Sequence, residues 1–274
     1  MTYRAICSDI DGTLLNKERQ LSQRTIRTIK NIGKDVPVIL ASSRMPSAMR
    51  HLQQELDILH HPLICFNGGY VLYFEDSSAE ALELDSVHIP APVCQTIHDF
   101  TASSGIHVSL YAQDNWYAPS FDYWAEREER ITKVSPRVTE LLPILQNWHQ
   151  TGTGAHKVMC MGPAEEIDVL QQELVKNFKE QVHAYRSKDT YLEIAPRAIS
   201  KATALELLLE KHFGIALDEV MAFGDNYNDI DMLQAVGMGI AVGNAREEVK
   251  AVAKEVTLNS TEDGVAVAIE KYWR

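Results

Sequence analysis

The stretch YRAICSDIDGT, residues 3–13, joins a short apolar run to two carboxylates. Such a run is typical of a buried strand in a parallel sheet, followed by polar residues at its carboxyl end. Ligand sites in open α/β sheets form beyond these strand ends, so Asp9 and Asp11 mark a candidate site. A surface turn or a calcium loop is the alternative. However, Leu14 and Leu15 follow at once, where a calcium loop continues with oxygen ligands.

Other apolar segments also end in polar residues. Predicted strands at 36–41, 63–66 and 219–223 are followed by Ser42-Ser43-Arg44, by Asn67-Gly68-Gly69 and by GDNYND at 224–229. Helical spacing lies between them, near 22–32 and from Lys201, with Ser200 as its cap, to about residue 212. This alternation predicts an α/β fold with a doubly wound, Rossmann-like parallel sheet.

The middle of the chain has a different pattern. Strand-like segments at 106–112 and 157–161 are separated by helical stretches, which predicts an α+β module with an antiparallel sheet. We expect residues 1–83 and 196–274 to form one core domain, and residues 84–195 to be inserted into it.

Composition narrows the class of protein. The chain has 38 acidic and 26 basic residues and a formal charge of −12, and it shows no basic cluster of the kind that binds nucleic acid. We see no signal peptide and no apolar run of membrane-spanning length. The four cysteines form no CxxC pair and are expected to be reduced, so we predict a cytoplasmic protein. The sequence does not indicate the oligomeric state.

The polar strand ends suggest metal chemistry. Several carboxylates repel one another unless a cation lies among them, and oxygen ligands without a His or Cys cluster favour Mg²⁺. Asp9 and Asp225 fit as side-chain ligands. Asp11 could offer its main-chain carbonyl, which leaves its carboxylate free as a general acid and base. Taken alone, residues 225–229 could merely cap a helix, and Lys201 would be interpreted as a solvated helix residue.

Together, these segments resemble a known family. DIDGT at 9–13, the step at Ser42, Lys201 and GDNYND at 224–229 are similar, in order and separation, to the four motifs of the haloacid dehalogenase superfamily. LEIAPRAISKATAL at 192–205 and GMGIAVGNA at 237–245 resemble its Cof-type subfamily, which carries a large type IIB cap between the second and third motifs. The resemblance covers nearly the whole chain and implies that the insert is a substrate-specificity cap.

The resemblance also implies roles. Asp9 would be the nucleophile, and Asp11 would protonate the leaving oxygen and then activate water. Lys201 and Ser42 would complete the catalytic set. The implied metal ligands and their supports are Asp9, Asp11, Asp225 and Asp229. The implied phosphate- and substrate-binding residues are Ser42, Ser43, Arg44, Asn67, Lys201 and Asn228, although Asn67 also suits a simple turn before two glycines.

The chain departs from the subfamily pattern at several positions. Ser42-Ser43-Arg44 stands where Thr-Gly-Arg is usual. Ser42 keeps the hydroxyl of the usual threonine, whereas Ser43 replaces a glycine at a position where the backbone would approach phosphate. Ala198 and Ala202 stand where the subfamily usually has glycine, and we expect only a local adjustment.

We therefore predict a Mg²⁺-dependent phosphatase that hydrolyses a small phosphomonoester, either a sugar phosphate or a phosphorylated cofactor, through an aspartyl-phosphate on Asp9. A phosphosugar mutase and a non-catalytic metabolite-binding protein on the same fold are the alternatives. The sequence does not reveal the substrate.

Overall fold

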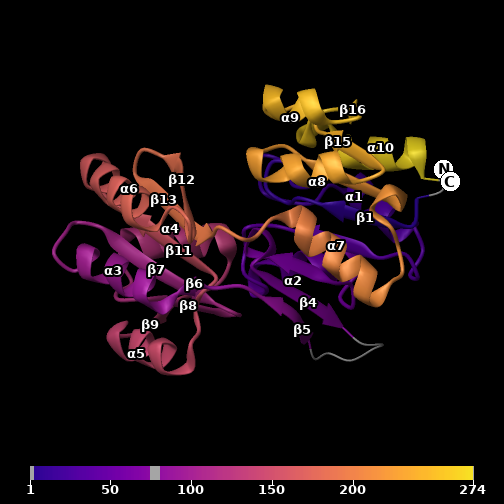
Figure 1. Ribbon diagram of the computed structural model, residues 1–274. Coiled ribbons are helices and arrows are strands. Elements are labelled where there is room, and N and C mark those ends of the chain that lie inside the picture. Colours follow the sequence, from indigo (N-terminus) through magenta and orange to yellow (C-terminus); the bar gives the residue numbers. More distant parts are fainter. Residues whose placement is uncertain (1–2, 75–80, 274) are drawn as a thin grey trace. The chain divides into compact units, whose positions relative to one another are not determined.

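The computed structural model describes residues 3–74 and 81–273 (Figure 1). The chain divides into two compact units. Unit 1 comprises Met1–Arg44, Met49–Asp85 and Ser200–Arg274, and unit 2 comprises Met45–Ala48 and Ser86–Ile199.

Unit 1 is built on an eight-stranded sheet in the order β16-β15-β14-β1-β2-β3-β4-β5. Its strands are β1 (Ala5–Ser8), β2 (Val38–Ala41), β3 (Leu63–Cys65), β4 (Tyr70–Phe74), β5 (Ala81–Ser86), β14 (Val220–Gly224), β15 (Met238–Ala241) and β16 (Glu255–Val256). Pairing is parallel from β16 through to β3. Every residue of β1, β2 and β14 is buried, as expected for central parallel strands.

The sheet changes direction after β3. A 3₁₀ turn, η1 (Phe66–Gly68), brings β4 back antiparallel to β3. Asn67 and Gly68 have φ values of 59° and 107°, in the left-handed region that glycine and asparagine adopt most readily. The sequence Asn67-Gly68-Gly69 therefore fixes a tight turn at the carboxyl end of β3.

Helices pack around this sheet in pairs. Helix α1 (Gln23–Lys30) contacts α10 (Gly264–Tyr272), and α7 (Lys201–His212) contacts α8 (Ile230–Ala235). The remaining helical elements described in unit 1 are α2 (Ser47–Leu56), whose first two residues cluster with unit 2, α9 (Glu247–Val252), η2 (Leu217–Glu219), η3 (Tyr227–Asp229) and η4 (Ser260–Glu262).

Unit 2 carries a six-stranded, mainly antiparallel sheet in the order β12-β13-β11-β7-β8-β9 and a two-stranded β10-β6 ribbon. Its elements are β6 (Ile89–Pro90), α3 (Ala91–Thr101), β7 (His107–Ala112), β8 (Asn115–Ala118), α4 (Tyr123–Thr132), β9 (Arg137–Val138), α5 (Leu142–Thr151), β10 (Gly154–Ala155), β11 (Lys157–Met161), α6 (Ala164–Phe178), β12 (Val182–Lys188) and β13 (Tyr191–Pro196).

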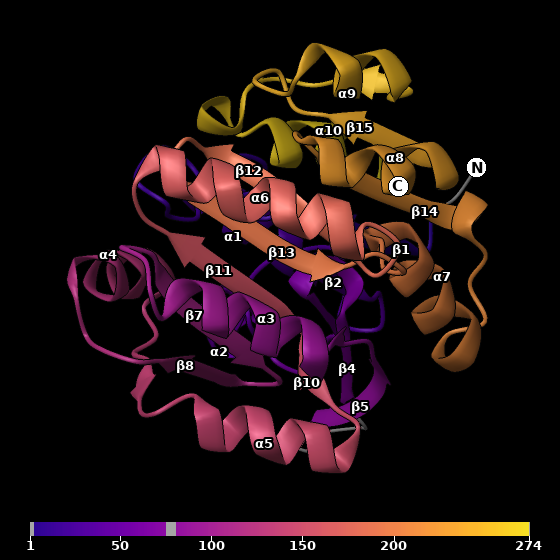
Figure 2. The ribbon, with the colours of Figure 1, turned by 60° about the vertical axis from the view of Figure 1, so that its left-hand side comes forward.

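Alternation along these strands gives the unit 2 sheet two different faces. Val108, Leu110, Val158 and Ile194 join the apolar core, to which α3 and α6 contribute (Figure 2). The alternate residues on the other face are largely polar or aromatic, and α4 contacts that face. Period-two alternation explains the contrast, because neighbouring side chains on a strand point to opposite faces.

The predicted α/β fold, with a parallel-sheet core and an inserted α+β module, is confirmed. The helix predicted from Lys201 to His212 has those bounds, with Ser200 as its N-cap. No helix in the described part of the chain is long and apolar enough to cross a membrane.

Candidate active site

The two central carboxylates of the site follow two neighbouring strands of the unit 1 sheet. Asp9 directly follows β1 and Asp225 directly follows β14, and these strands pair in parallel with Ser8 opposite Phe223. The Asp9 N–H donates to the Phe223 carbonyl at 3.0 Å, so the pairing continues to the sheet edge. Parallel register is therefore what brings residues from opposite ends of the chain together.

Three carboxylates form a compact cluster. Asp9, Asp225 and Asp229 each offer an oxygen, and these oxygens lie within 4.8 Å of one another. Burial raises the pKa of Asp9 against the attraction of Lys201, and the nearby carboxylates of Asp229 and Asp225 raise it further. Repulsion of this kind favours a bound cation at the cluster.

Lys201 partly neutralises the cluster. Its ammonium is fully buried and donates to Asp9 Oδ1 at 2.6 Å and to Asp229 Oδ1 at 2.7 Å. Burial alone would lower the pKa of Lys201, but the attraction of Asp229 and Asp9 outweighs burial and raises it. Three carboxylates and one ammonium leave two negative charges, which one divalent cation would balance.

Asp229 holds the loop that carries Asp225. Its Oδ2 accepts hydrogen bonds from the main-chain N–H groups of Asp225 at 2.9 Å and Asn226 at 3.0 Å. A Cβ on Gly224 would lie 2.4 Å from the Asp229 Cβ, so only glycine fits at that position. Since both oxygens of Asp229 accept hydrogen bonds from protein groups, its main effect is to position Asp225 and Lys201.

Thr13 and Gly12 support Asp225 from the other side. The Thr13 hydroxyl is buried and donates to Asp225 Oδ1 at 2.7 Å. Gly12 has φ +89°, and a Cβ there would lie 2.5 Å from Asp225 Oδ2. The Asn244 amide donates to the Gly12 carbonyl at 2.7 Å. The sequence analysis did not assign Thr13 and Asn244 to the site, although Thr13 stands inside the DIDGT motif.

Asp11 lies in a different environment from Asp9. Its carboxylate accepts hydrogen bonds from Arg44 Nε at 2.7 Å and from the second Arg44 nitrogen at 2.8 Å, and Arg19 lies 3.5 Å away. Burial would raise the pKa of Asp11, but the bonds and charge of Arg44 outweigh it and lower the pKa. The pairing of Asp11 with Arg44 was not predicted from the sequence.

The other predicted residues lie on the neighbouring strand ends. Ser42 is buried after β2, and its carbonyl accepts from the Asn67 N–H at 2.9 Å. Ser43 is half-buried beside it. The Asn228 amide donates to Asn67 Oδ1 at 2.9 Å, so η1 and η3 meet through these two side chains.

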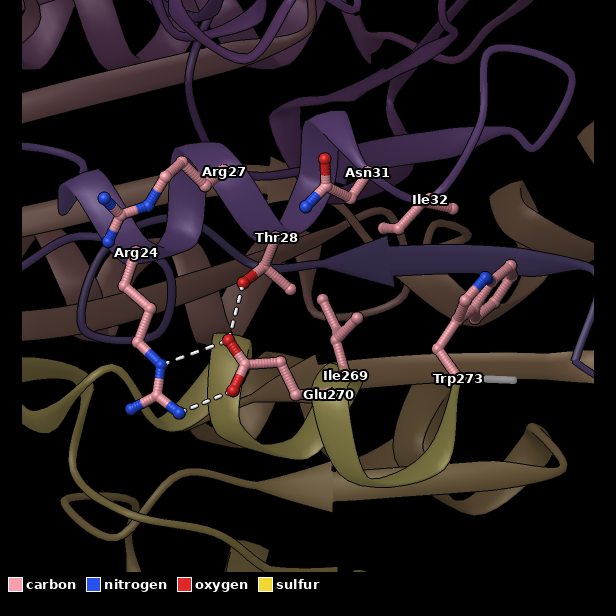
Figure 3. A pocket seen from close by; sticks show the side chains of 8 residues that line it. All are labelled: Arg24, Arg27, Thr28, Asn31, Ile32, Ile269, Glu270 and Trp273. Atoms are coloured by element: carbon pink, nitrogen blue, oxygen red, sulfur yellow. Dashed lines mark hydrogen bonds and ion pairs between the residues drawn. The ribbon is translucent and has the colours of Figure 1, made fainter.

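A separate pocket of about 440 Å³ lies between α1 and α10 (Figure 3). Its Arg24 makes two hydrogen bonds to Glu270, at 3.1 and 2.5 Å, and Thr28 also donates to Glu270. Because the carboxylate of Glu270 already pairs with Arg24, this pocket is a poor phosphate site compared with the strand ends.

The comparisons with known proteins agree with this geometry. The family model of haloacid dehalogenase-like hydrolases matches residues 6–269. The chain belongs to this family. The resemblance inferred from the motifs is thus confirmed, as is the prediction of a phosphoric monoester hydrolase.

Individual relatives span the whole chain. A Haemophilus influenzae protein, whose name gives phosphatase as its provisional function, is 30% identical over 99% of this chain and 98% of its own length. A Bacillus subtilis 5-amino-6-(5-phospho-D-ribitylamino)uracil phosphatase is 26% identical over 98% of this chain and 97% of its own. The crystal structure of a haloacid dehalogenase-like hydrolase from Bacteroides thetaiotaomicron is 30% identical, with a TM-score of 0.86, and covers 98% of this chain and 99% of its own.

Proposed function

We propose that this hydrolase is a Mg²⁺-dependent phosphatase that transfers the phosphoryl group of a small metabolite to Asp9 and then to water. The observation that carries the proposal is the cluster of Asp9, Asp225 and Asp229 within 4.8 Å, with the buried ammonium of Lys201 between two of its members. The contacts of these groups indicate which part of the reaction each group would perform.

Asp9 is the proposed nucleophile. One of its carboxylate oxygens forms a bond to phosphorus while the ester P–O bond breaks, and the leaving oxygen takes a proton from Asp11. Asp11 then removes a proton from water, whose oxygen attacks phosphorus as the bond to Asp9 breaks and orthophosphate leaves. Lys201 stays protonated throughout and offsets charge on Asp9 and the transferred group.

The cluster fits a divalent cation with oxygen ligands. Asp9 and Asp225 would hold the ion, with the Asp11 carbonyl as a further proposed ligand and Asp229 positioning Asp225. Hard carboxylate oxygens favour Mg²⁺, which neutralises charge on a transferring phosphoryl group when it is bound. The two negative charges left by Asp9, Asp225, Asp229 and Lys201 support a dication at this position.

Arg44 connects the binding of phosphate to the state of the general acid, Asp11. In the structure it holds Asp11 as a carboxylate, a form that cannot donate a proton. A phosphoryl group would compete for the same guanidinium, because arginine binds phosphate and carboxylate in the same two-pronged way. We therefore propose that Arg44 turns toward the substrate with Ser42, Ser43, Asn67 and Asn228. Asp11, released from Arg44, then takes up a proton from solvent, and this is the proton that it gives to the leaving oxygen.

The proposed substrate is a small phosphorylated metabolite, either a sugar phosphate or a phosphorylated cofactor. The name of the Bacillus subtilis relative, which places its phosphate on a ribityl chain, supports this class. We further propose that residues 84–195 form the specificity domain, whose own sheet and apolar core support an independently folded insert.

Phosphate release from p-nitrophenyl phosphate and a panel of phosphorylated metabolites tests the proposal. We expect wild-type activity with Mg²⁺, none after chelation, and recovery when Mg²⁺ is restored. Asp9→Asn should lose roughly 10³-fold or more in kcat. The exposed Asp35→Asn is the matched control and should retain wild-type turnover. Turnover by Asp9→Asn equal to that of wild type would refute the assignment of the nucleophile.

A further inference from the structure

Tyr191 belongs to a row of side chains on the polar face of the unit 2 sheet. The strands β12, β13, β11 and β7 lie side by side in that order (Figure 2). Across them, Lys188, Tyr191, Met161 and His107 are direct neighbours. The opposite face of the same sheet packs into the apolar core through residues such as Leu192. The Tyr191 side chain therefore lies on the face that α4 contacts, away from the core.

Three side chains contact the Tyr191 ring. Trp124, from α4, meets it edge-on with ring centroids 5.5 Å apart. The guanidinium carbon of Arg127 lies 5.2 Å from the ring centroid, and the Lys188 ammonium lies 5.3 Å from it. One aromatic ring and two cations thus surround a tyrosine that is only 5% exposed.

The Tyr191 hydroxyl has no partner. Within residues 3–74 and 81–273, the side chain of Ser187 apart, no hydrogen-bonding atom reaches it, although it is shielded from solvent. Leaving a buried donor unsatisfied costs about 1–3 kcal/mol, so such groups are rare in native proteins. An unpartnered hydroxyl on a ring that two cations contact is what a binding site for an acceptor group would provide.

Two other buried side chains on this face, His107 and Trp116, have hydrogen-bond partners, which makes the contrast informative. His107 Nδ1 lies 2.7 Å from Asp122, and its Nε2 lies 2.9 Å from the Ser109 hydroxyl. The Trp116 indole N–H donates to the same hydroxyl at 2.9 Å. Asp122 in turn caps α4 by accepting from the Trp124 N–H. The environment can therefore provide partners, and it does so for the neighbours of Tyr191.

Both charges that contact the Tyr191 ring are positive, which favours an anion there. They belong to Arg127 and Lys188, while the buried Glu128 and Glu193, two residues along β13 on the same face, supply negative charges nearby. Burial raises the pKa of Tyr191, and Glu128 raises it further, so the hydroxyl keeps its proton and acts as a donor. Lys188 is exposed and Arg127 is half-buried, so both cations belong to long side chains that can adjust to a ligand.

We propose that Tyr191, Arg127 and Lys188 form an anion-binding site in unit 2, where a phosphate or carboxylate group accepts a hydrogen bond from the Tyr191 hydroxyl and pairs with the two cations. This site lies outside the carboxylate cluster of unit 1 and does not depend on the proposed reaction. The anion is a free phosphate or a free small carboxylate.

Titration of the metal-free protein with inorganic phosphate tests the site, with the fluorescence of Trp124 as reporter. Phosphate should change the fluorescence of wild type, and Trp124→Phe should lose most of that change. Tyr191→Phe should weaken phosphate binding about 5- to 10-fold, and the Arg127→Gln/Lys188→Gln double variant at least about tenfold. Lys176→Gln, on α6, and Tyr117→Phe, on the core side of the sheet, are controls that should bind as wild type does.

Two results would overturn the proposal: no fluorescence change in wild type, or equal phosphate affinity in wild type, Tyr191→Phe and the double variant. Thermal unfolding gives an independent check. Because the hydroxyl has no partner, Tyr191→Phe should unfold at the same temperature as wild type or higher. A clearly lower midpoint would show that the hydroxyl is already bonded within the protein, which also contradicts the site.

Kinetics separate this site from the proposed reaction. Tyr191→Phe should leave the KM for p-nitrophenyl phosphate unchanged while its phosphate affinity falls. A failure of the phosphatase assay with intact phosphate binding would count against the proposed function alone.

Discussion

Thr13 shows how much of the site depends on single side chains that never touch the nucleophile. Its hydroxyl donates to Asp225 Oδ1 at 2.7 Å from a position that is 1% exposed. Thr13→Val keeps the shape but removes the donor, so Asp225 should lose its fixed orientation and metal affinity should fall. Losing a positioning bond of this kind typically costs 10- to 100-fold in metal affinity or activity.

The matched control is Thr13→Ser, which retains the hydroxyl. We expect Thr13→Val to require 10- to 100-fold more Mg²⁺ for half-maximal activity and Thr13→Ser to stay within about threefold of wild type. Activation curves with Mg²⁺ measure this directly. Equal Mg²⁺ requirements for the valine and serine variants would show that the hydrogen bond is unimportant.

Individual side chains also show how much of the site can be predicted from the sequence. Asp9, Asp225 and Lys201 could be placed in one site because strand ends meet at one sheet edge and the motif order is specific. The pairing of Asp11 with Arg44 could not be predicted from the sequence, because it depends on the direction of two side chains 33 residues apart. Neither Thr13 nor Tyr191 gives a sequence signal that identifies its partner, since a hydroxyl fits many environments.

At the scale of elements, helix α7 positions Lys201 through its first turn. The Ser200 hydroxyl accepts from the Thr203 N–H at 3.1 Å, and the Thr203 hydroxyl accepts from the Ser200 N–H at 3.3 Å. This reciprocal cap satisfies two N–H groups at the helix start. The serine and the helix start were predictable, because serine before a helical pattern is a strong N-terminal signal.

Removing the cap should weaken the helix start. Ser200→Ala should lower the free energy of unfolding by about 1 kcal/mol, whereas Ser200→Asp, which keeps an acceptor, should lose less. Urea denaturation of both variants beside wild type measures the difference. If alanine and aspartate are equally destabilising, the cap is not what stabilises α7.

At the scale of the whole molecule, each unit has its own sheet, and their sequence patterns differ for a physical reason. The central strands of unit 1 are buried on both faces and appear as continuous apolar runs. Strands of unit 2 have one apolar face and one polar or aromatic face, so they alternate. The two patterns made the insert recognisable from sequence, but they say nothing about which polar groups on its second face remain unpaired.

Unit 2 also contains a buried histidine that should make stability depend on pH. His156 is fully buried, its Nδ1 accepts from the Gln113 N–H at 2.9 Å, and its Nε2 lies 3.0 Å from the Ser86 hydroxyl. Burial, with a smaller contribution from the neighbouring His88, lowers the pKa of His156 to about 3. A proton on Nδ1 would break the bond to Gln113, so the folded state requires the neutral ring.

The sign of the pH effect follows from proton binding. In the unfolded chain a histidine takes up a proton near pH 6.5, whereas folded His156 does so only near pH 3. Between these values the unfolded state binds more protons, so stability should fall as pH decreases from 6.5. The contribution of this residue approaches about 1.4 kcal/mol per pH unit below pH 6. Urea denaturation followed by fluorescence reports mainly on unit 2, which contains Trp116, Trp124 and Trp148.

His156→Gln isolates this effect, because glutamine can still accept from Gln113 but does not titrate. The variant should lose stability at pH 7.5 through imperfect packing. Its free energy of unfolding should then decrease less steeply than that of wild type between pH 6.5 and 4, so the two curves converge on acidification. Parallel curves over this range would mean that His156 already carries its proton in the folded protein, in conflict with its contact to the Gln113 N–H.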